Sequence, residues 1–456
     1  MSTKVTFSSR LGLIAATVGS AVGLGNIWRF PAEVHSNGGA AFLIVYIICM
    51  LVLGIPVMLA EFSLGRGGRS DAEGVFRKLA PGTKWWVGGA IAIIASYLIL
   101  SFYMVVAGWT FEYLWQSITG NLYELVQDTT ADVDKGFKDK MAEYMCNPYN
   151  PLINIYVLII INILVLMGGV KKGIERMSNI LMPVLFVLLL IFAIFSLSLP
   201  KAAEGLRFFF TPDFSKINLN VIVNALGQTF FSLSLGMGIL VTYSSYYPSK
   251  TKLIPTSLTV SVLDLLVAIL MGIIIFPAAA SFGLTDAGLA GTTLVFVTLP
   301  EIFAAMPLTR LWSILFFLLL LVAALTSTIS IAEVSVAWLQ DKYKKSRKAA
   351  VMIVMTPLFA ISSICSLSFS TLSNIKIAGL NIFDFLDTLA TNCMLPTASI
   401  ITCLFIGWKL RSDFLRNEIT NHGLTGTRIY PAISFIIKYC APPLIFIILI
   451  GSFIDF

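Results

Sequence analysis

The sequence predicts an all-α protein that crosses a membrane many times. Of its 456 residues, 57% are hydrophobic and only 12% are charged, about half the charged fraction that the surface of a soluble globular protein needs. Several uncharged stretches run for about 20 residues, the length of helix that spans the hydrocarbon core of a bilayer. Examples are residues 41–60, 91–109, 180–199 and 311–331. These run lengths exclude an apolar but soluble core.

We expect about eleven membrane-spanning helices, joined by loops too short to separate two domains. The predicted helices cover residues 10–36, 40–65, 86–118, 151–168, 173–200, 220–247, 254–283, 308–342, 348–369, 378–410 and 430–454. Residues 1–456 then form a single membrane domain. Its two five-helix halves span about 10–200 and 220–410, and one extra helix follows at about 430–454.

The lysines and arginines predict how the chain is oriented in a cytoplasmic membrane. They gather in the loops that follow every second helix, as in residues 66–84 and 342–348, and such loops face the cytoplasm. The N-terminus is therefore predicted inside and, with an odd number of helices, the C-terminus outside. The net charge of +7 reflects this topology rather than binding to nucleic acid. The first nine residues are polar, and no cleavable signal peptide precedes the first helix.

Two of the predicted helices contain closely spaced glycines in mid-membrane. The first carries Gly19, Gly23 and Gly25, and the sixth carries Gly236 and Gly238. Each glycine costs about 1 kcal/mol relative to alanine in a helix interior, although small residues also allow helices to pack closely. Because the first and sixth helices occupy corresponding places in the two halves, the pair favours broken helices around a binding site.

Broken helices in a membrane persist only where they line a polar cavity. Their exposed N–H groups attract a carboxylate, and their exposed carbonyls attract a cation. The oxygen-bearing side chains near the breaks are Ser20, Asn26, Ser232, Ser234 and Asp264. Oxygen ligands suit a hard cation such as Na⁺, and with two histidines and no CxxC motif a transition-metal site is not expected. An amino acid accompanied by Na⁺ fits both requirements.

The eighth predicted helix adds Ala323, Thr326 and Ser327. Residues three and four apart lie on one face of a helix, so a carbonyl and two hydroxyls are brought together there. Serine and threonine hydroxyls also bond back to their own helix. The spacing alone leaves an ion site and this local bonding open.

Several segments resemble the neurotransmitter:sodium symporter family, and bacterial members that carry amino acids are the closest in pattern. The matching segments are residues 10–14, 19–31, 37–42, 54–61, 227–238 and 325–327. The resemblance extends over nearly the whole chain. It implies the leucine-transporter fold, in which two inverted five-helix repeats have unwound first and sixth helices. It also implies sodium-coupled import of hydrophobic or aromatic L-amino acids by alternating access.

The resemblance further implies two Na⁺ sites beside one substrate site. One ion is placed among Ala21, Asn26, Ser232 and Asp264, and the other among Gly19, Val22, Ala323, Thr326 and Ser327. The implied substrate contacts are Ser20, Ala21, Gly23, Leu24, Gly25, Ile99, Tyr103, Phe231, Ser232, Ser234, Met237, Ser327 and Ile331.

Two gates and a hinge are implied in the same way. The outer gate is Arg29 with Asp387, beneath which Phe231 and Tyr103 form a lid. The inner gate is formed by Lys4, Ser245, Tyr246 and Asp341. Gly173 and Pro183 imply a fifth helix that unwinds and hydrates the second ion. As a departure, Lys4 and Phe7 stand where the family usually has arginine and tryptophan.

Three functional classes remain to be weighed on the sequence. A membrane enzyme is disfavoured because no nucleophile–base pair is evident. A channel or a transport-inactive amino-acid sensor could share the fold, but two gates favour alternating access. Within the symporter class, Gly23 implies an amino-acid substrate, because monoamine-carrying relatives are implied to place an aspartate there. Asp264 predicts independence from chloride, if it supplies a negative charge beside the first ion. A protonated Asp264 that only forms hydrogen bonds, and an Asp264 that is a structural partner of a neighbouring hydroxyl, are the alternatives.

Overall fold

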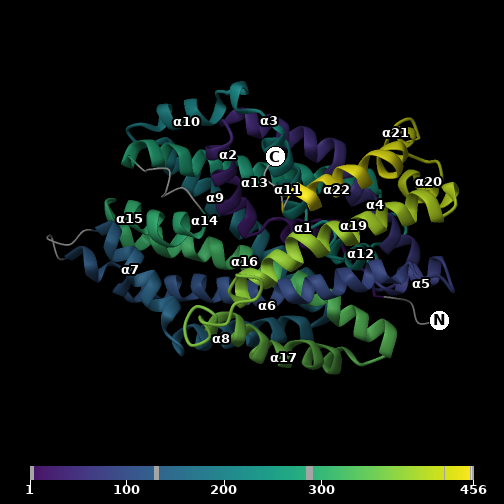
Figure 1. Ribbon diagram of the computed structural model, residues 1–456, viewed down its shortest axis with the longest axis horizontal. Coiled ribbons are helices and arrows are strands. Elements are labelled where there is room, and N and C mark those ends of the chain that lie inside the picture. The colour runs from purple at the N-terminus through teal and green to yellow at the C-terminus, as the bar shows by residue number, and fades with distance from the viewer. Residues whose placement is uncertain (1–4, 128–132, 284–290, 426, 452, 454–456) are drawn as a thin grey trace.

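The protein is a bundle of long helices (Figure 1). The computed structural model describes residues 5–127, 133–283, 291–425, 427–451 and 453. Within this part of the chain no β-strand forms, and nine helices, or ten if one bent pair is a single span, are long and apolar enough to cross a membrane. The predicted all-α polytopic fold is confirmed.

The spans of the first half lie close to their predicted positions. They are α1 (Arg10–Ala21) with η1 (Gly25–Arg29) and α2 (Phe30–Ser36), α3 (Ala40–Cys49) with η2 (Met50–Gly54) and α4 (Ile55–Gly68), α6 (Trp86–Thr119), α8 (Asn150–Met167), and η4 (Val170–Glu175) with α9 (Arg176–Leu197). The connecting helices are α5 (Gly74–Leu79), α7 (Val133–Cys146) and α10 (Ala202–Phe210).

The second half begins with the split pair α11 (Leu219–Ser232) and α12 (Ile239–Ser244). It continues with α13 (Leu253–Phe282), α16 (Thr309–Tyr343), α17 (Arg347–Leu367), the span Ile382–Lys409, which includes α19 (Leu395–Leu404), and the span Tyr430–Gly451, which includes α22 (Ala441–Gly451). The helices α15 (Leu299–Ala304) and α20 (Ser412–Thr420) lie in its loops. Because α11 and α12 are each too short to span a membrane, a count by length omits the predicted helix at 220–247.

Both predicted breaks are present. The chain leaves α1 at Val22, whose ψ of 105° is extended, and the two parts of this span meet at 56°. In the sixth span, Ser234, Gly236 and Gly238 have φ values of +54°, +78° and +72°, in the left-handed region that favours glycine. A Cβ on Gly236 would lie 2.4 Å from the Leu395 carbonyl oxygen. The glycines therefore serve the backbone turn and the close packing around it.

The broken helices lie inside the bundle. α1 contacts α9, α13 and α16, while α16 packs along α6 (Figure 1). The break in the sixth span is supported from α4, where a buried Glu61 carboxylate oxygen accepts a hydrogen bond from the Gly236 N–H at 2.8 Å. A backbone group that has left its helix is thus satisfied by a side chain, as burial in a membrane requires.

The fifth span is helical over its whole length in this conformation. Residues 170–197 are helical throughout, first as the π-helical η4 and then as α9, and Pro183 lies inside α9. Gly173 lies in η4, where a Cβ would approach the Val165 carbonyl oxygen to 2.1 Å. In this conformation Gly173 permits close contact with the end of α8, and no unwound turn separates it from Pro183.

Candidate functional site

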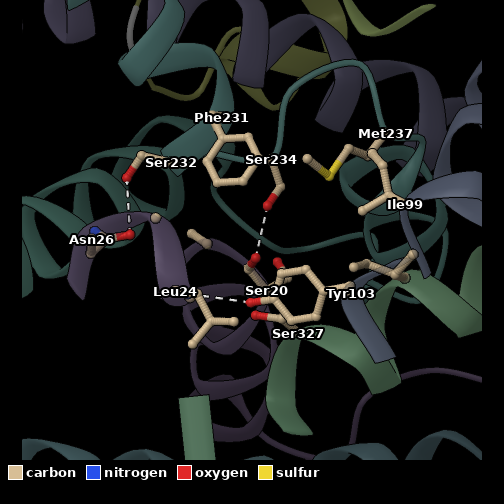
Figure 2. Close-up of a pocket in the computed structure, with 14 residues that line it drawn as sticks. Ser20, Leu24, Asn26, Ile99, Tyr103, Phe231, Ser232, Ser234, Met237 and Ser327 are labelled. Atoms are coloured by element: carbon tan, nitrogen blue, oxygen red, sulfur yellow. Dashed lines mark hydrogen bonds between the residues drawn. The ribbon is translucent and has the colours of Figure 1, made fainter. Parts of the chain in front are cut away.

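The two breaks, α6 and α16 enclose a small cavity of about 30 Å³ (Figure 2). It is lined by Ser20, Ala21, Gly23, Leu24, Gly25, Asn26, Ile99, Tyr103, Phe231, Ser232, Ser234, Met237, Ser327 and Ile331. The structure therefore brings together every residue expected to contact the substrate. A water needs about 10–15 Å³ by this kind of measure, so a larger occupant requires movement of the walls.

One side of the cavity is polar and belongs to the break in the first span. The Leu24 N–H donates to the Tyr103 hydroxyl at 3.2 Å, and the Ser234 hydroxyl donates to the Ser20 carbonyl at 2.7 Å. A Cβ on Gly23 would lie 3.2 Å from the Tyr103 hydroxyl and 3.0 Å from the Ser327 hydroxyl. These N–H and O–H groups form a place for a carboxylate, and the absent side chain of Gly23 keeps it open.

The other side of the cavity is apolar. Ile99 from α6, Met237 from the sixth span and Ile331 from α16 are all buried. Phe231 closes the same side at the end of α11, as Figure 2 shows. Methionine repacks more easily than a rigid ring, so this wall is suited to apolar groups of different sizes.

Beside the cavity, a fully buried carboxylate collects the polar side chains of the first predicted ion site. Asp264 Oδ1 accepts from Asn26 Nδ2 at 2.8 Å, and Oδ2 accepts from the Ser232 hydroxyl at 2.7 Å. The Tyr46 hydroxyl also donates to Oδ2, at 3.2 Å. Carboxylate, amide and hydroxyl oxygens together with one negative charge fit Na⁺. Tyr46 was missed because nothing in the apolar segment around it indicates which way its hydroxyl points.

Two residues of the second predicted ion site, Gly19 and Thr326, lie close together where α1 packs against α16. A Cβ on Gly19 would lie 3.3 Å from Thr326 Cβ. The Thr326 hydroxyl donates to the carbonyls of Val322 at 3.2 Å and Ala323 at 2.9 Å, so the local bonding considered as an alternative does occur. The lone pairs of that hydroxyl oxygen can still coordinate a cation. The oxygen set fits Na⁺ as well.

The outer gate residues do not form a direct ion pair. Arg29 lies 3.9 Å from Glu33, one turn away, and its guanidinium lies 5.4 Å from the centre of the Phe231 ring. Asp387 accepts a hydrogen bond from the Thr391 hydroxyl at 3.3 Å. Among the described residues, no ion pair of 4.0 Å or less joins Arg29 to Asp387. Glu33 competes for the arginine because it lies four residues further along, in the adjoining helix α2.

Of the inner gate, Lys4 lies outside the described residues. The Tyr246 hydroxyl donates to Glu333 at 2.8 Å, and Glu333 pairs with Arg347 at 2.6 Å. The Ser245 hydroxyl donates to the Thr242 carbonyl, whereas Asp341 accepts from Ser70 at 3.4 Å. The buried Glu333–Arg347 pair was not predicted, because no spacing rule links residues on α16 and α17.

Phe7 fills a neighbouring aromatic pocket despite departing from the family pattern. Its ring centre lies 6.0–6.2 Å from those of Tyr243, Tyr246 and Tyr247, and its N–H donates to the Tyr246 carbonyl at 3.0 Å. The N-terminal segment is thereby fixed to the end of the sixth span.

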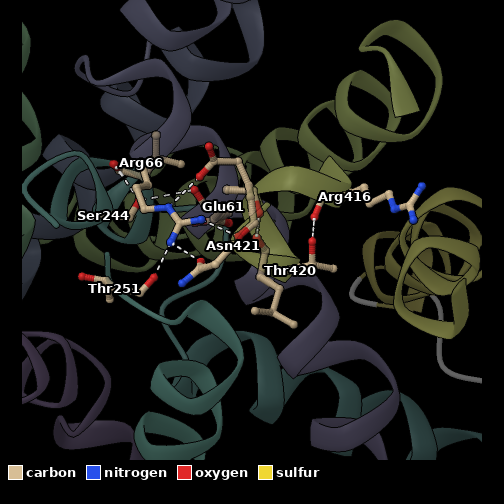
Figure 3. Close-up of polar contacts among 11 residues, drawn as sticks. Glu61, Arg66, Ser244, Thr251, Arg416, Thr420 and Asn421 are labelled. Atoms are coloured by element: carbon tan, nitrogen blue, oxygen red, sulfur yellow. Dashed lines mark hydrogen bonds and ion pairs between the residues drawn. The ribbon is translucent and has the colours of Figure 1, made fainter. Parts of the chain in front are cut away.

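A further polar cluster surrounds Arg66 at the end of α4 (Figure 3). This arginine is 6% exposed and donates to the Glu418 carboxylate at 2.6 Å and to Asn421 Oδ1 at 3.0 Å. It also donates to the carbonyls of Glu418 and Thr251. Arg66 therefore joins α4 to α20 and to the loop before α13. In the sequence analysis, Arg66 was considered only as one of the basic loop residues that indicate the topology.

Comparisons with known proteins agree with this architecture. The family description "Sodium:neurotransmitter symporter family" matches residues 4–131 and 140–456. The chain is 35% identical to the uncharacterized sodium-dependent transporter YhdH of Bacillus subtilis over 98% of this chain and 97% of that one. It is also 35% identical to an uncharacterized sodium-dependent transporter of Haemophilus influenzae, over 98% of each.

A solved structure is similar over the same length. The crystal structure of MhsT in complex with L-phenylalanine has a TM-score of 0.88 and 43% sequence identity, and covers 99% of this chain and 100% of its own. The matches span the broken helices and the cavity between them. The chain therefore belongs to the sodium:neurotransmitter symporter family and is a sodium-dependent membrane transporter.

Proposed function

We propose that this transporter imports hydrophobic and aromatic L-α-amino acids together with two Na⁺ and without chloride. The observation that carries the proposal is the cavity at the two breaks. It presents backbone and hydroxyl polar groups on one side and an apolar wall on the other, next to a buried carboxylate. The similarity to MhsT, whose crystal structure contains L-phenylalanine, supports the same substrate class.

In the proposed complex, each part of the substrate meets a matching part of the cavity. The Leu24 and Gly25 N–H groups and the Tyr103 hydroxyl hold the carboxylate. The side chain enters between Ile99, Phe231, Met237 and Ile331 and displaces these flexible walls. The remaining contacts come from Ser20, Ala21, Gly23, Ser232, Ser234 and Ser327.

The two ions are proposed to bind as cosubstrates on either side of this cavity. Ala21, Asn26, Ser232 and Asp264 hold the first, close to the substrate carboxylate. Gly19, Val22, Ala323, Thr326 and Ser327 hold the second, and so tie α1 to α16. This link explains coupling, because an ion that joins two helices favours the conformation in which they are close.

Alternating access is proposed to use the gates at either end of the bundle. Arg29 and Asp387 approach each other when the outer side closes, while Lys4, Ser245, Tyr246 and Asp341 close the inner side. Opening of the fifth span between Gly173 and Pro183 then releases the second ion inward. The N-terminus is proposed to lie in the cytoplasm and the C-terminus outside, in a bacterial cytoplasmic membrane.

Uptake into proteoliposomes tests the function directly. An inward Na⁺ gradient should concentrate leucine, phenylalanine or tryptophan above the external level, because the ion gradient drives the substrate. Isoleucine, valine, methionine and tyrosine should compete, whereas aspartate, lysine and glycine should compete at least about tenfold less well, since the apolar wall offers them no partner. Equilibration without accumulation would instead identify a channel, and binding without uptake a sensor.

Removing the hydroxyl of Thr326 should weaken sodium dependence. In Thr326→Ala, we expect the Na⁺ concentration for half-maximal uptake to rise about tenfold, equivalent to losing about 1.4 kcal/mol of ion binding. Thr328→Ala is the matched control. Its hydroxyl is also buried on α16 but bonds only to the Leu325 carbonyl, at 3.1 Å. Equal Na⁺ titrations for Thr326→Ala and wild type would contradict the second ion site.

A further inference from the structure

A second cavity, of about 380 Å³, lies between α6, α16 and α17 near the start of α6. Its walls include Ala90, Ile94 and Leu98 from α6, Trp338 and Leu339 from α16, and Ile353 from α17. Ile94 is 53% exposed and Ile353 47% exposed, so the cavity opens between these helices at the surface of the bundle. In a membrane, the medium at this opening is lipid. We call the cavity the α6–α17 groove.

One end of the groove is charged. Glu73, next to α5, lies 2.8 Å from Lys342 Nζ and 2.6 Å from an Arg77 guanidinium nitrogen. Burial would raise the pKa of Glu73, but hydrogen bonds from Lys342, Trp338 and Arg77 hold it below its ordinary value. The carboxylate is therefore ionised and is shared by two cations.

The two cations remain accessible although their shared carboxylate is buried. The Glu73 side chain is 3% exposed, whereas Lys342 is 37% and Arg77 47% exposed. Both are also steadied by indole rings. Arg77 lies 4.3 Å from the ring centre of Trp86, and Lys342 lies 5.0 Å from that of Trp338. Pre-positioned Arg and Lys side chains of this kind recognise phosphate.

We propose that the α6–α17 groove binds one acyl chain of an anionic phospholipid, whose phosphate lies at Lys342 and Arg77. The length of the groove matches the length of an acyl chain in one leaflet of a bilayer. From Trp86 to Leu98 the lining extends about 18 Å along α6, at about 1.5 Å per residue, and one leaflet of the hydrocarbon core is about 15 Å thick. The lysine- and arginine-rich loops at this end place the lipid in the cytoplasmic leaflet.

The bound chain braces the helices that form the substrate cavity. Leu98 faces the groove and the next residue on α6, Ile99, lines the cavity. On α16, Trp338 and Leu339 lie about two turns beyond Ile331. A lipid in the groove therefore packs against the outer side of α6 and α16, while their inner side contacts the proposed substrate.

Native mass spectrometry of the detergent-purified full-length protein tests the lipid site. Titration with phosphatidylglycerol should yield one tightly retained lipid, bound at least about tenfold more strongly than phosphatidylcholine with the same chains. In the double variant Arg77→Gln/Lys342→Gln, this preference should disappear. Equal retention of the two lipids by wild type would overturn the proposal.

Two tryptophan substitutions test whether the retained lipid occupies the groove. Ala90→Trp fills the groove from within, and Ile94→Trp blocks its exposed opening with little risk to folding. Both should lose the retained phosphatidylglycerol. The matched control Ile194→Trp changes an isoleucine on α9 that is 69% exposed and should keep the lipid. Retention by Ile94→Trp at the wild-type level would refute this location. Because the readout is bound mass, it is independent of the substrate and of uptake.

Discussion

In chloride-free medium, Asp264→Asn should reduce Na⁺-driven amino-acid uptake at least about a hundredfold, whereas wild type should transport equally in gluconate and in chloride. Asp264 is fully buried and accepts hydrogen bonds from Asn26, Ser232 and Tyr46. Asparagine keeps nearly the same shape but removes the negative charge. A cation bound there would then be buried without compensation, a defect that typically costs about 3–5 kcal/mol.

Two controls separate the charge from its surroundings. Tyr46→Phe removes one hydrogen-bond donor but leaves the carboxylate, so its effect should be much smaller. Asp213→Asn removes an exposed carboxylate in the segment before α11, outside the proposed ion and substrate sites, and should leave uptake unchanged. If chloride supplies the missing charge, it should partly restore Asp264→Asn. Dependence of wild type on chloride would refute the proposed role of Asp264.

Gly23→Asp should reduce binding of leucine or phenylalanine at least about a hundredfold. A Cβ at this position would lie 3.0 Å from the Ser327 hydroxyl and 3.2 Å from the Tyr103 hydroxyl. The new carboxylate would therefore occupy the region proposed for the carboxylate of the substrate. Two negative charges about 4 Å apart repel by about 4 kcal/mol at an effective dielectric constant of about 20, in addition to the loss of space.

Isothermal titration calorimetry in the presence of Na⁺ measures this loss, and Gly23→Asn supplies the neutral control of nearly equal size. Asparagine should impair binding through its size alone, by less than aspartate does. Phenylethylamine, which lacks the carboxylate, should bind Gly23→Asp better than it binds wild type. Leucine binding that survives in Gly23→Asp would contradict the proposed orientation of the substrate.

Both breaks were predictable because closely spaced glycines mark them in the sequence, and in the sixth span the backbone shows the reason. Gly236 and Gly238 adopt positive φ, which a side chain disfavours, and the sequence therefore marks these turns without any tertiary information. The side chains that form hydrogen bonds to the backbone at these breaks were harder to predict from the sequence. Glu61 lies in a segment that resembles the family, but its hydrogen bond to the Gly236 N–H depends on how α4 packs against the break.

Groups that act across several helices were the hardest to predict. The paired charges Arg347 and Glu333, like Arg66 and Glu418, belong to different helices. For Arg29, the resemblance implied a pairing with Asp387 from a distant span, but in the structure the arginine lies nearer to Glu33, four residues further along the chain. Such pairings follow from the packing of helices, which hydropathy and spacing do not specify.

The sequence alone determined that this protein is a polytopic helical membrane protein with two broken spans. These properties rest on run length, composition and glycine conformation, all of which are local. Only the tertiary structure decided that Tyr46 completes the cluster at Asp264, that the cavity holds only about 30 Å³, that residues 170–197 are continuously helical, and that α6, α16 and α17 enclose a groove. Each of these features depends on the distance and the rotation between neighbouring helices. That helix packing is determined jointly by many side chains that are far apart in the sequence.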